Sequence, residues 1–534
     1  MAKRQDELAA YNFARKRTVA AFLAPSPGGS EEGAPRPMRT VTPSLALGVV
    51  LVIGFIAYGV IKPAAPAGWD KPGEYIIVDS DSTTRYVVLP DKAAKGGKVL
   101  HPVLNYASAK LLLDKGKGSV LEVPGSAIDK SGIAHGATIG IPYAPDRLPS
   151  ASDAQQAKTW AVCERPASGG GSDNSINRAV FVLDAADAKT LDDSGRVDSG
   201  EALYVKDSKS GLEYLVDGRG NRFLLGGVGL GQPTMESLRS AVIGSSSTTT
   251  AQPVSEEWLR TLNPGENITF PTVPDLNQPT AVHGLPSQAT TVGQVVKTQD
   301  AQGWQNYVVL KNKVAAVSPF VAALLEASPT FKPASGTGGN NAITVNREAV
   351  ITANGGGAEK FYDDKGWPEQ VPRQANPATS ATGQARTTSC SVYKGTFGAD
   401  KKPQLAAWAG TAFPKKVVSD SLSAYVSSGS GLLFKELTGA AGGGGAQYLL
   451  TDTGLRYALP SNNDSTAKGN TAVSSPSSSS SDGSSQSASE TDKARTRLGY
   501  GDITNLTLVP QTWAEFIPKG PTLDTGAASQ EQSQ

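Results

Sequence analysis

Residues 45–61 read LALGVVLVIGFIAYGVI, and this apolar run determines the architecture that we expect for the chain. No charged residue occurs between Arg39 and Lys62, so the uncharged stretch reaches 22 residues. A bilayer core about 30 Å thick needs roughly 20 residues of helix. Pro43 fits the first turn of such a helix, where its missing N–H costs little. We therefore expect one transmembrane helix at 45–61.

The same run has two other interpretations, a cleaved signal peptide and a helix buried in a protein core. A signal peptide begins closer to the N-terminus and ends in a cleavage site of small residues. Here 44 residues precede the run, and the sequence Ala64-Ala65-Pro66-Ala67 offers only weak cleavage chemistry. An uncleaved signal anchor is therefore favoured.

Charged residues on the two sides of the run predict its orientation. Residues 1–44 carry seven basic and four acidic side chains, a net charge of +3, whereas 62–74 is balanced. Because cytoplasmic flanks carry the excess of Lys and Arg, we expect 1–44 inside the cell and 62–534 outside the cell (inner) membrane. Residues 3–23 have good helix formers, early acids and later bases, which predicts a helix. Two roles fit that helix equally well, lying on lipid headgroups or docking on a cytoplasmic partner.

The composition of the chain excludes several functions. With 534 residues and a formal net charge of +1, the chain has no global field that would attract nucleic acid. The histidines His101, His135 and His283 show no short metal-ligand spacing. Two cysteines cannot supply a four-thiolate site. We therefore expect no metal ion, no other cofactor and no nucleic-acid partner.

Beyond the apolar run, one small unit recurs along the chain. It begins with a β-hairpin rich in β-branched and aromatic residues, seen at 75–89, 203–225, 304–310 and 432–459. A helical pattern follows each hairpin, and the last of these is the weakest: 103–113, 234–244, 319–327 and 498–503. Two units close on similar sequences, Trp258–Gly265 and Trp513–Gly520. One such unit cannot bury its own apolar face, so we expect the units to stack.

These units predict how the outer part of the chain is divided. Four small repeat domains are expected at 62–149, 201–280, 281–334 and 431–523. A central β-rich domain is expected from two separate segments, 150–200 and 335–430. The Ser-rich insertion 461–490 and the tail 524–534 are expected to be disordered. The expected fold class is a single-pass membrane protein with an elongated α+β extracytoplasmic domain.

Cys163 and Cys390 lie in the two segments of the expected central domain. An extracytoplasmic domain occupies an oxidising setting, where disulfides persist. The chain-entropy model assigns roughly 5 kcal/mol, as an upper figure, to so long a loop. We expect the two residues to form a disulfide, and two buried free thiols are the alternative.

Several features of the chain are shared with a known family. They are the single apolar run, the later Cys390, RQDELAAYNFARKR at 4–17, HPVLNYASAKLLL at 101–113, WAVC at 160–163 and PKGPTLD at 518–524. On these features the chain resembles EccB, a membrane core subunit of the type VII (ESX) secretion system of actinobacteria. The resemblance covers nearly the whole chain, and the Ser-rich insertion departs from the family pattern.

The resemblance implies a fold and a set of partners. The fold is four repeat domains around a central β-domain that contains one disulfide. The partners are an EccC-like motor ATPase, EccD-like and EccE-like membrane subunits and a mycosin protease on the outer side. The resemblance also implies self-association through the extracytoplasmic domain. The membrane helix itself would contact lipid.

Some EccB proteins carry an ATPase label, which makes a nucleotide-binding motif the chemistry to test. A Walker A motif needs G-x-x-x-x-G-K-[ST], because backbone N–H groups, Lys and a hydroxyl hold phosphate and Mg²⁺. The nearest sequences, Gly97-Lys98-Val99 and Gly116-Lys117-Gly118, lack both the hydroxyl and the upstream Gly. The run from Gly227 to Gly231 resembles a dinucleotide loop without a βαβ context, so a turn is favoured. We predict no catalytic residue, and we expect His101 to cap or pack beside its neighbouring proline.

The expected function is that of a structural and assembly subunit of the type VII secretion membrane complex, supporting export of folded substrate proteins. An ATPase subunit of the same system is the alternative. A cell-wall-binding receptor fits repeats plus an anchor when the family resemblance is set aside.

Overall fold

The structure is a computed structural model that describes most of the chain. The described residues are 4–23, 38–61, 65–167, 175–193, 195–227, 230–244, 249–301, 303–333, 340–353, 359–377, 385–417, 423–438, 445–460 and 489–532. They divide into two compact units. One is drawn from residues 1–70, 79–83 and 121–132, and the other from the rest of the chain.

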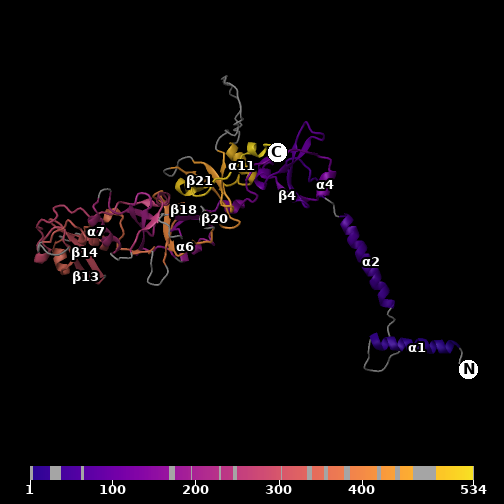
Figure 1. Ribbon diagram of the computed structural model, residues 1–534, viewed down its shortest axis with the longest axis horizontal. Coiled ribbons are helices and arrows are strands. Elements are labelled where there is room, and N and C mark those ends of the chain that lie inside the picture. Colours follow the sequence, from indigo (N-terminus) through magenta and orange to yellow (C-terminus); the bar gives the residue numbers. More distant parts are fainter. Residues whose placement is uncertain are drawn as a thin grey trace, which may run out of the picture. The chain divides into compact units, whose positions relative to one another are not determined.

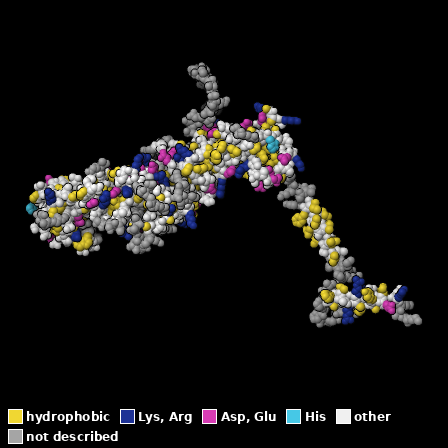
Figure 2. All heavy atoms as spheres, in the orientation of Figure 1, with side chains coloured by type: hydrophobic (Ala, Val, Ile, Leu, Met, Phe, Trp, Pro, Cys, Tyr) yellow, Lys and Arg dark blue, Asp and Glu magenta, His cyan; other side chains and the backbone are white. Residues whose placement is uncertain are grey.

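Two long helices open the chain (Figure 1). The first, α1 (Arg4–Leu23), has acidic side chains in its first turn, where they interact favourably with the helix dipole. The second, α2 (Met38–Ile61), has 24 residues, and Figure 2 shows hydrophobic side chains along its visible face. Among the described residues, no helix combines the length and the apolarity needed to cross a membrane. The expected transmembrane helix at 45–61 falls within α2 and stays a prediction.

The strands of the described residues form five sheets, and four of these share one order of elements. Each of the four starts with three antiparallel strands, continues with a helix and ends in one or two short returning strands. The first contains β1 (Tyr75–Asp79), β2 (Arg85–Pro90), β3 (Lys98–Val103), α3 (Tyr106–Leu112), β4 (Ser119–Val123), α4 (Gly125–Lys130) and β5 (Ala134–His135). Its last strand, β5, runs parallel to β3.

The second and third sheets follow the same order. The second contains β8 (Glu201–Asp207), β9 (Glu213–Asp217), β10 (Asn221–Leu224), α7 (Gln232–Ile243), β11 (Gln252–Val254), α8 (Glu256–Arg260) and β12 (Asn263–Pro264). The third contains η2 (Ser287–Ala289), β13 (Val295–Asp300), β14 (Gly303–Val309), β15 (Val314–Val317), α9 (Pro319–Glu326), β16 (Ile343–Thr344), α10 (Arg347–Ala353) and η3 (Asp363–Lys365). In each, a returning strand runs parallel to the first strand, β11 to β8 and β16 to β13.

The fourth sheet closes the chain. It contains β21 (Leu432–Leu437), β22 (Gln447–Leu450), β23 (Arg456–Leu459), α11 (Glu490–Leu498), β24 (Thr507–Pro510), α12 (Gln511–Ala514) and, after it, α13 (Thr525–Ala528). Its returning strand β24 runs parallel to β21. The helices of these sheets pack in pairs. Residues of α3 and α11 share one hydrophobic cluster, and residues of α7 and α9 share another.

The fifth sheet joins two distant segments of the chain. Its strands, in spatial order, are β19 (Pro403–Gly410), β18 (Thr388–Phe397), β6 (Thr159–Pro166), β7 (Ile176–Leu183) and β20 (Ser423–Val426). We call it the central sheet. Two short helices flank β6 and β7 in sequence, α5 (Ala151–Ala154) and α6 (Lys189–Asp193). One more short strand, β17 (Arg373–Gln374), pairs with β8 of the second sheet.

Capping side chains explain where the helices of these sheets begin. The Asn105 side chain accepts a hydrogen bond from Ser108 N at the start of α3. The Ser318 side chain caps the first turn of α9 in the same way, and the Ser255 side chain caps the first turn of α8. Each cap satisfies an N–H group that the first turn of a helix leaves without a partner. The helices therefore begin where a polar residue directly follows or closely trails a strand.

Three expectations about boundaries were wrong. The tail 524–534 was expected to be disordered, but Thr525–Ala528 form α13, and the Gln532 side chain donates to Gly140 O at 2.8 Å. The fourth helix was expected at 498–503, whereas α11 ends at Leu498. The third sheet extends past residue 334, because β16 pairs with β13. Residues 461–488 of the Ser-rich insertion lie outside the described residues. The remaining domain boundaries stay predictions.

Candidate functional site: the junction on the central sheet

The central sheet has two buried faces, which explains the near-continuous apolar runs of its strands. Along β6, side chains alternate between the faces, so Trp160 and Val162 enter one hydrophobic cluster while Cys163 enters another. β-branched and aromatic residues suit such strands because they pack well on a pleated surface. A sheet covered on both faces can hold other elements of the chain on each side.

Cys163 and Cys390 lie directly opposite each other on β6 and β18. Their Sγ atoms are 2.04 Å apart in a disulfide that links positions 227 residues apart in the sequence. Both residues are fully buried. The bond therefore ties together the two chain segments that build the central sheet.

Removing this bond with the double variant Cys163→Ala, Cys390→Ala should destabilise the sheet by about 2–4 kcal/mol, because the cross-link restricts the unfolded chain. Thermal unfolding of the full chain in mild detergent measures the effect. Each single variant should unfold close to the double variant, since either one breaks the link. An unfolding temperature equal to that of the wild type would contradict this prediction.

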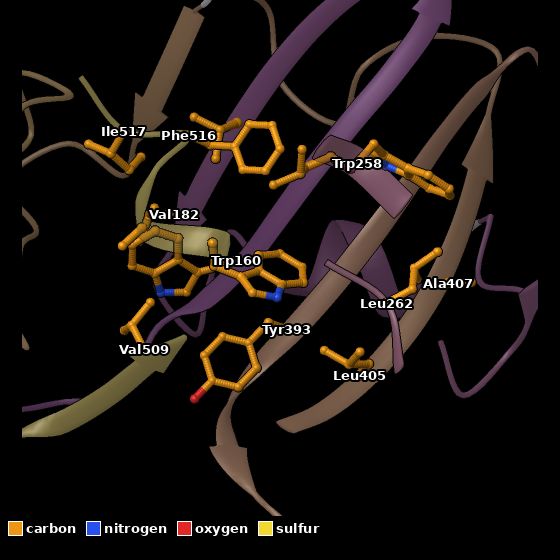
Figure 3. Close-up of a cluster of buried hydrophobic side chains, with 14 of the residues drawn as sticks. Trp160, Val182, Trp258, Leu262, Tyr393, Leu405, Ala407, Val509, Phe516 and Ile517 are labelled. Atoms are coloured by element: carbon orange, nitrogen blue, oxygen red, sulfur yellow. Dashed lines mark hydrogen bonds between the residues drawn. The ribbon is translucent and has the colours of Figure 1, made fainter. Parts of the chain in front are cut away.

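A hydrophobic cluster on one face of the central sheet also contains residues of the second and fourth sheets. Figure 3 shows Trp160 and Tyr393 near its centre, with Trp258 and Phe516 around them. The Trp160 ring meets Phe434 of β21 edge to face, with centroids 5.9 Å apart. We call this contact region the junction; its members on the central sheet, the second sheet and the fourth sheet include Trp160, Val162, Glu164, Tyr393, Ser255, Trp258, Phe434 and Trp513.

Glu164 on β6 is a fully buried carboxylate in the junction. Its Oε2 accepts a hydrogen bond from Ser255 N at 2.8 Å. Its Oε1 accepts from Ser255 Oγ and from Arg178 Nε, each at 2.6 Å. Ser255 Oγ in turn accepts from Trp258 N, and Trp258 Nε1 donates to Val162 O at 2.9 Å. One carboxylate thus fixes the start of α8, and with it the second sheet, to the central sheet.

The fourth sheet is held by separate polar contacts. Asp153 of α5 accepts from the buried Lys158 Nζ at 2.6 Å and from Gly431 N, just before β21, at 2.7 Å. Tyr393 Oη donates to Leu508 O of β24 at 2.7 Å. Burial raises the pKa of the Tyr393 hydroxyl, so the hydroxyl stays a donor at physiological pH. Buried polar groups that form hydrogen bonds, as these do, favour one arrangement of the packed elements.

Asp187, near α6, forms a second hydrogen-bonded network on the other face of the central sheet. Its carboxylate accepts from Lys415 Nζ at 2.6 Å, from Ser427 Oγ at 2.6 Å and from Tyr425 Oη at 3.2 Å. The hydrogen bonds from Lys415 and then Ser427 lower the pKa of Asp187, and they outweigh the opposite effect of burial. Asp187 therefore stays ionised well into the acid range.

The pKa of Asp187 gives a pH-dependent prediction. A carboxylate whose folded pKa is depressed stabilises the fold fully above its unfolded pKa of about 3.9 and loses this effect as pH falls through the folded pKa. Asp187→Asn should therefore lower the unfolding temperature at neutral pH, and the difference from the wild type should vanish in strong acid. The exposed Asp192→Asn serves as the control. A loss that is independent of pH would contradict the assignment.

The glycine-lysine sequences singled out above lie in turns. Gly97 N donates to Ala94 O in the turn before β3. Lys117 Nζ lies 3.2 Å from Glu74 Oε1, so its ammonium is paired. Gly227 and Gly231 flank two residues that the structure does not describe. Within the described part of the chain, no group of three or more His, Cys, Asp and Glu side chains could hold a metal ion.

His101 packs on a neighbouring strand segment. Its Nδ1 lies 2.9 Å from Ala137 O, and a Cβ added at Gly136 would come within 2.3 Å of the ring. The same contact of an aromatic ring on a glycine occurs in two other sheets, in the pairs Phe223 with Gly265 and Tyr457 with Gly520. His101 therefore occupies a position that aromatic packing residues fill in the other sheets.

The junction residues were only partly visible in the sequence. The similar closing sequences pointed to Trp258 and Trp513, and WAVC pointed to β6. Nothing singled out Glu164. The available signal was a charged residue directly after a buried apolar run, which indicates a paired charge as readily as a strand end.

Four small sheet-and-helix modules, two of them packed on one disulfide-linked sheet, define a modular α+β protein. A family model described as "Type VII secretion system ESX-1, transport TM domain B" matches residues 2–534, and the chain therefore belongs to this EccB family. A relative named "ESX-1 secretion system ATPase EccB1", from Mycolicibacterium smegmatis (strain MKD8), is 27% identical over 293 residues. That alignment covers 55% of this chain and 55% of the relative, so the chain matches about half of the relative's length.

Two solved structures share the fold. One is a chain from the structure of an intact ESX-5 inner membrane complex, with a TM-score of 0.58 and 19% identity. The match covers 100% of this chain and 96% of that chain. The second is an EccB3 dimer from the ESX-3 core complex, with a TM-score of 0.56 and 20% identity, covering 85% and 99%. At these identities the comparison establishes the fold.

Proposed function

We propose that this chain is a structural and assembly subunit of a type VII secretion membrane complex, where it supports export of folded substrate proteins. The observation that carries the proposal is the match of the EccB family model to residues 2–534. The junction supplies a physical basis, because modules fixed to a common sheet present their surfaces at constant spacing. Constant spacing is what a scaffold must offer its partners.

In this proposal α2 crosses the cell (inner) membrane once, with residues 1–44 in the cytoplasm and 62–534 on the periplasmic side. Exposed apolar side chains such as Leu45, Val50 and Phe55 support it, because lipid is a solvent that suits them. The disulfide also supports it, since disulfides persist in oxidising compartments. Labelling of an Ala10→Cys variant by an impermeant maleimide in intact cells would overturn this topology.

The proposed partners are an EccC-like motor ATPase, EccD-like and EccE-like membrane subunits, a mycosin protease and further copies of this chain. Solved relatives in an ESX-5 inner membrane complex and in an EccB3 dimer support this set. Tagged full-length chain, extracted from native membranes in mild detergent, should bring with it a multi-transmembrane subunit and a motor ATPase. Recovery of the chain alone would contradict the proposal.

An ATPase role is the second candidate, favoured by the names of relatives such as EccB1. Lys117, one of the residues considered for phosphate binding, already pairs its charge with Glu74. Purified full chain should release no phosphate from Mg²⁺-ATP above a buffer control. Activity that copurifies with the chain and disappears in Lys117→Ala would favour the ATPase instead.

A further inference from the structure

The second and fourth sheets place the same residue types at equivalent positions. In both, a tyrosine lies on the middle strand of the meander. On the first strand, an acidic residue lies two positions after the residue that pairs with this tyrosine. On the third strand, an arginine lies two positions before the residue that pairs with the same tyrosine. The fourth sheet fills these positions with Tyr448, Glu436 and Arg456, and the second sheet with Tyr214, Asp207 and Arg222.

In the fourth sheet, the arginine and the acidic residue form an ion pair. Arg456 Nη1 donates to Glu436 Oε1 at 3.0 Å, and Arg456 Nε donates to Ile517 O at 3.1 Å. The guanidinium also lies 4.9 Å from the centroid of the Tyr448 ring. Arg456 is 3% exposed, so its charge is buried together with a carboxylate partner. A buried guanidinium needs such a partner.

In the second sheet, the arginine and the acidic residue are not paired with each other. Arg222 again lies over its tyrosine, with Cζ 5.8 Å from the Tyr214 centroid. Asp207 is one methylene shorter than Glu436 and is occupied elsewhere, because it accepts from Lys209 N and from Ser210 N. Arg222 Nε, whose counterpart in Arg456 donates to Ile517 O, is buried and makes no hydrogen bond within the described part of the chain. No carboxylate among the described residues forms an ion pair with Arg222, whereas Arg456 Nη1 contacts Glu436.

A pocket of about 560 Å³ opens beside this arginine. Its charged lining consists of Asp207, Lys209, Arg222, Glu256 and Arg260. Glu256 and Arg260 neutralise each other in an ion pair of 2.5 Å, and Asp207 is committed to its turn. Asp207 keeps its negative charge, so the lining carries three cations and two carboxylates, a net charge of +1, which favours a negatively charged group.

We propose that this pocket binds a carboxylate, which takes in the second sheet the place that the Glu436 side chain fills in the fourth. The planar guanidinium of Arg222 matches a carboxylate through two parallel N–H donors, and Lys209 adds a second charge. The apolar parts of Leu212, Tyr214 and Leu259 line the pocket and admit a short carbon chain behind the carboxylate. A small dicarboxylate and an acidic side chain of a peptide both carry this group.

Ligand-observed saturation transfer on the full chain in mild detergent tests the site. The probes are succinate and the peptide acetyl-Ala-Glu-Ala-amide, with sodium chloride at matched ionic strength as the blank. Arg222→Gln should weaken binding at least about tenfold, the loss expected for a charge-assisted bidentate contact. Arg222→Lys should retain part of the affinity. Arg219→Gln, an exposed arginine in the neighbouring turn, should leave binding unchanged.

The two probes separate the sources of the carboxylate. Binding of succinate supports a soluble dicarboxylate, and binding of the peptide alone supports an acidic protein segment. Failure of both probes to bind would overturn the proposal. Equal losses in Arg222→Gln and Arg219→Gln would also overturn it, because they would show general surface attraction. None of these outcomes depends on whether the chain assembles into a secretion complex.

Discussion

Glu164→Ala should destabilise the junction by about 3–5 kcal/mol, the range for removing one partner of a buried ion pair. The substitution leaves Arg178 without its closest carboxylate and the Ser255 backbone N–H without an acceptor. Ser255 is buried, so water replaces its lost acceptor poorly. The Arg178 side chain is 26% exposed and keeps only the longer contact with Glu257, at 3.3 Å. Thermal unfolding of the full chain in mild detergent should show the loss.

Glu257→Ala is the matched control for this substitution. Its carboxylate also contacts Arg178, at 3.3 Å, but its side chain is 60% exposed. Exposed ion pairs contribute between zero and about 1 kcal/mol, so Glu257→Ala should unfold nearly as the wild type does. Hydrogen exchange adds a local measurement, since protection should fall at β11 and α8 before it falls at β18. Equal effects of the two substitutions would show that burial of Glu164 has no special role.

The sequence predicted the hairpins of the first, second and fourth sheets well, for a physical reason. In the third sheet, the expected hairpin at 304–310 covers only β14 and misses its partner β13. Tyr75–Asp79 and the strand after it are dense in β-branched and aromatic residues, and the same features mark Leu203–Val216. Local composition therefore carries the strand signal. The disulfide was predictable because two cysteines in an oxidising compartment leave one pairing.

Elements that depend on distant partners were not predictable from local sequence. α11 (Glu490–Leu498) reads ETDKARTRL, with too few apolar residues for a clear helical stripe, and it is held by packing of Ala494 and Leu498 against α3. The residues of α13 are small and polar, which suggested disorder. Just after the helix, however, Gln530 O accepts from Gly140 N, and the Gln532 side chain donates to Gly140 O. Tertiary contacts decided both elements.

Glu164 and the proposed carboxylate pocket were likewise not predictable from local sequence. A glutamate after WAVC can be a buried ion-pair partner or a solvated strand end, and only the position of Ser255, 91 residues away in sequence, decides between them. Arg222 and Arg456 look alike in sequence. Their difference depends on one methylene between Asp207 and Glu436, together with the turn that Asp207 caps.

Trp258→Ala should destabilise the junction by about 3–5 kcal/mol, because it removes a large, fully buried ring and leaves a cavity. The substitution also removes the hydrogen bond from Trp258 Nε1 to Val162 O. Trp258→Phe keeps one buried aromatic ring and loses the pyrrole ring and the hydrogen bond, so it should cost less, about 1–2 kcal/mol. Trp304→Ala is the control, since that indole is 50% exposed and lies outside the junction.

Combining Trp258→Ala with Glu164→Ala tests whether the junction acts as one unit. Both side chains meet at Ser255, which caps α8 and accepts from the Trp258 backbone. Residues in one network give non-additive losses of about 0.5–3 kcal/mol in a double-variant cycle. The double variant should therefore lose less stability than the two single losses together, because either one already frees α8. Strictly additive losses would show two independent attachments of the second sheet, and the fixed spacing proposed for the scaffold would then rest on each of them separately.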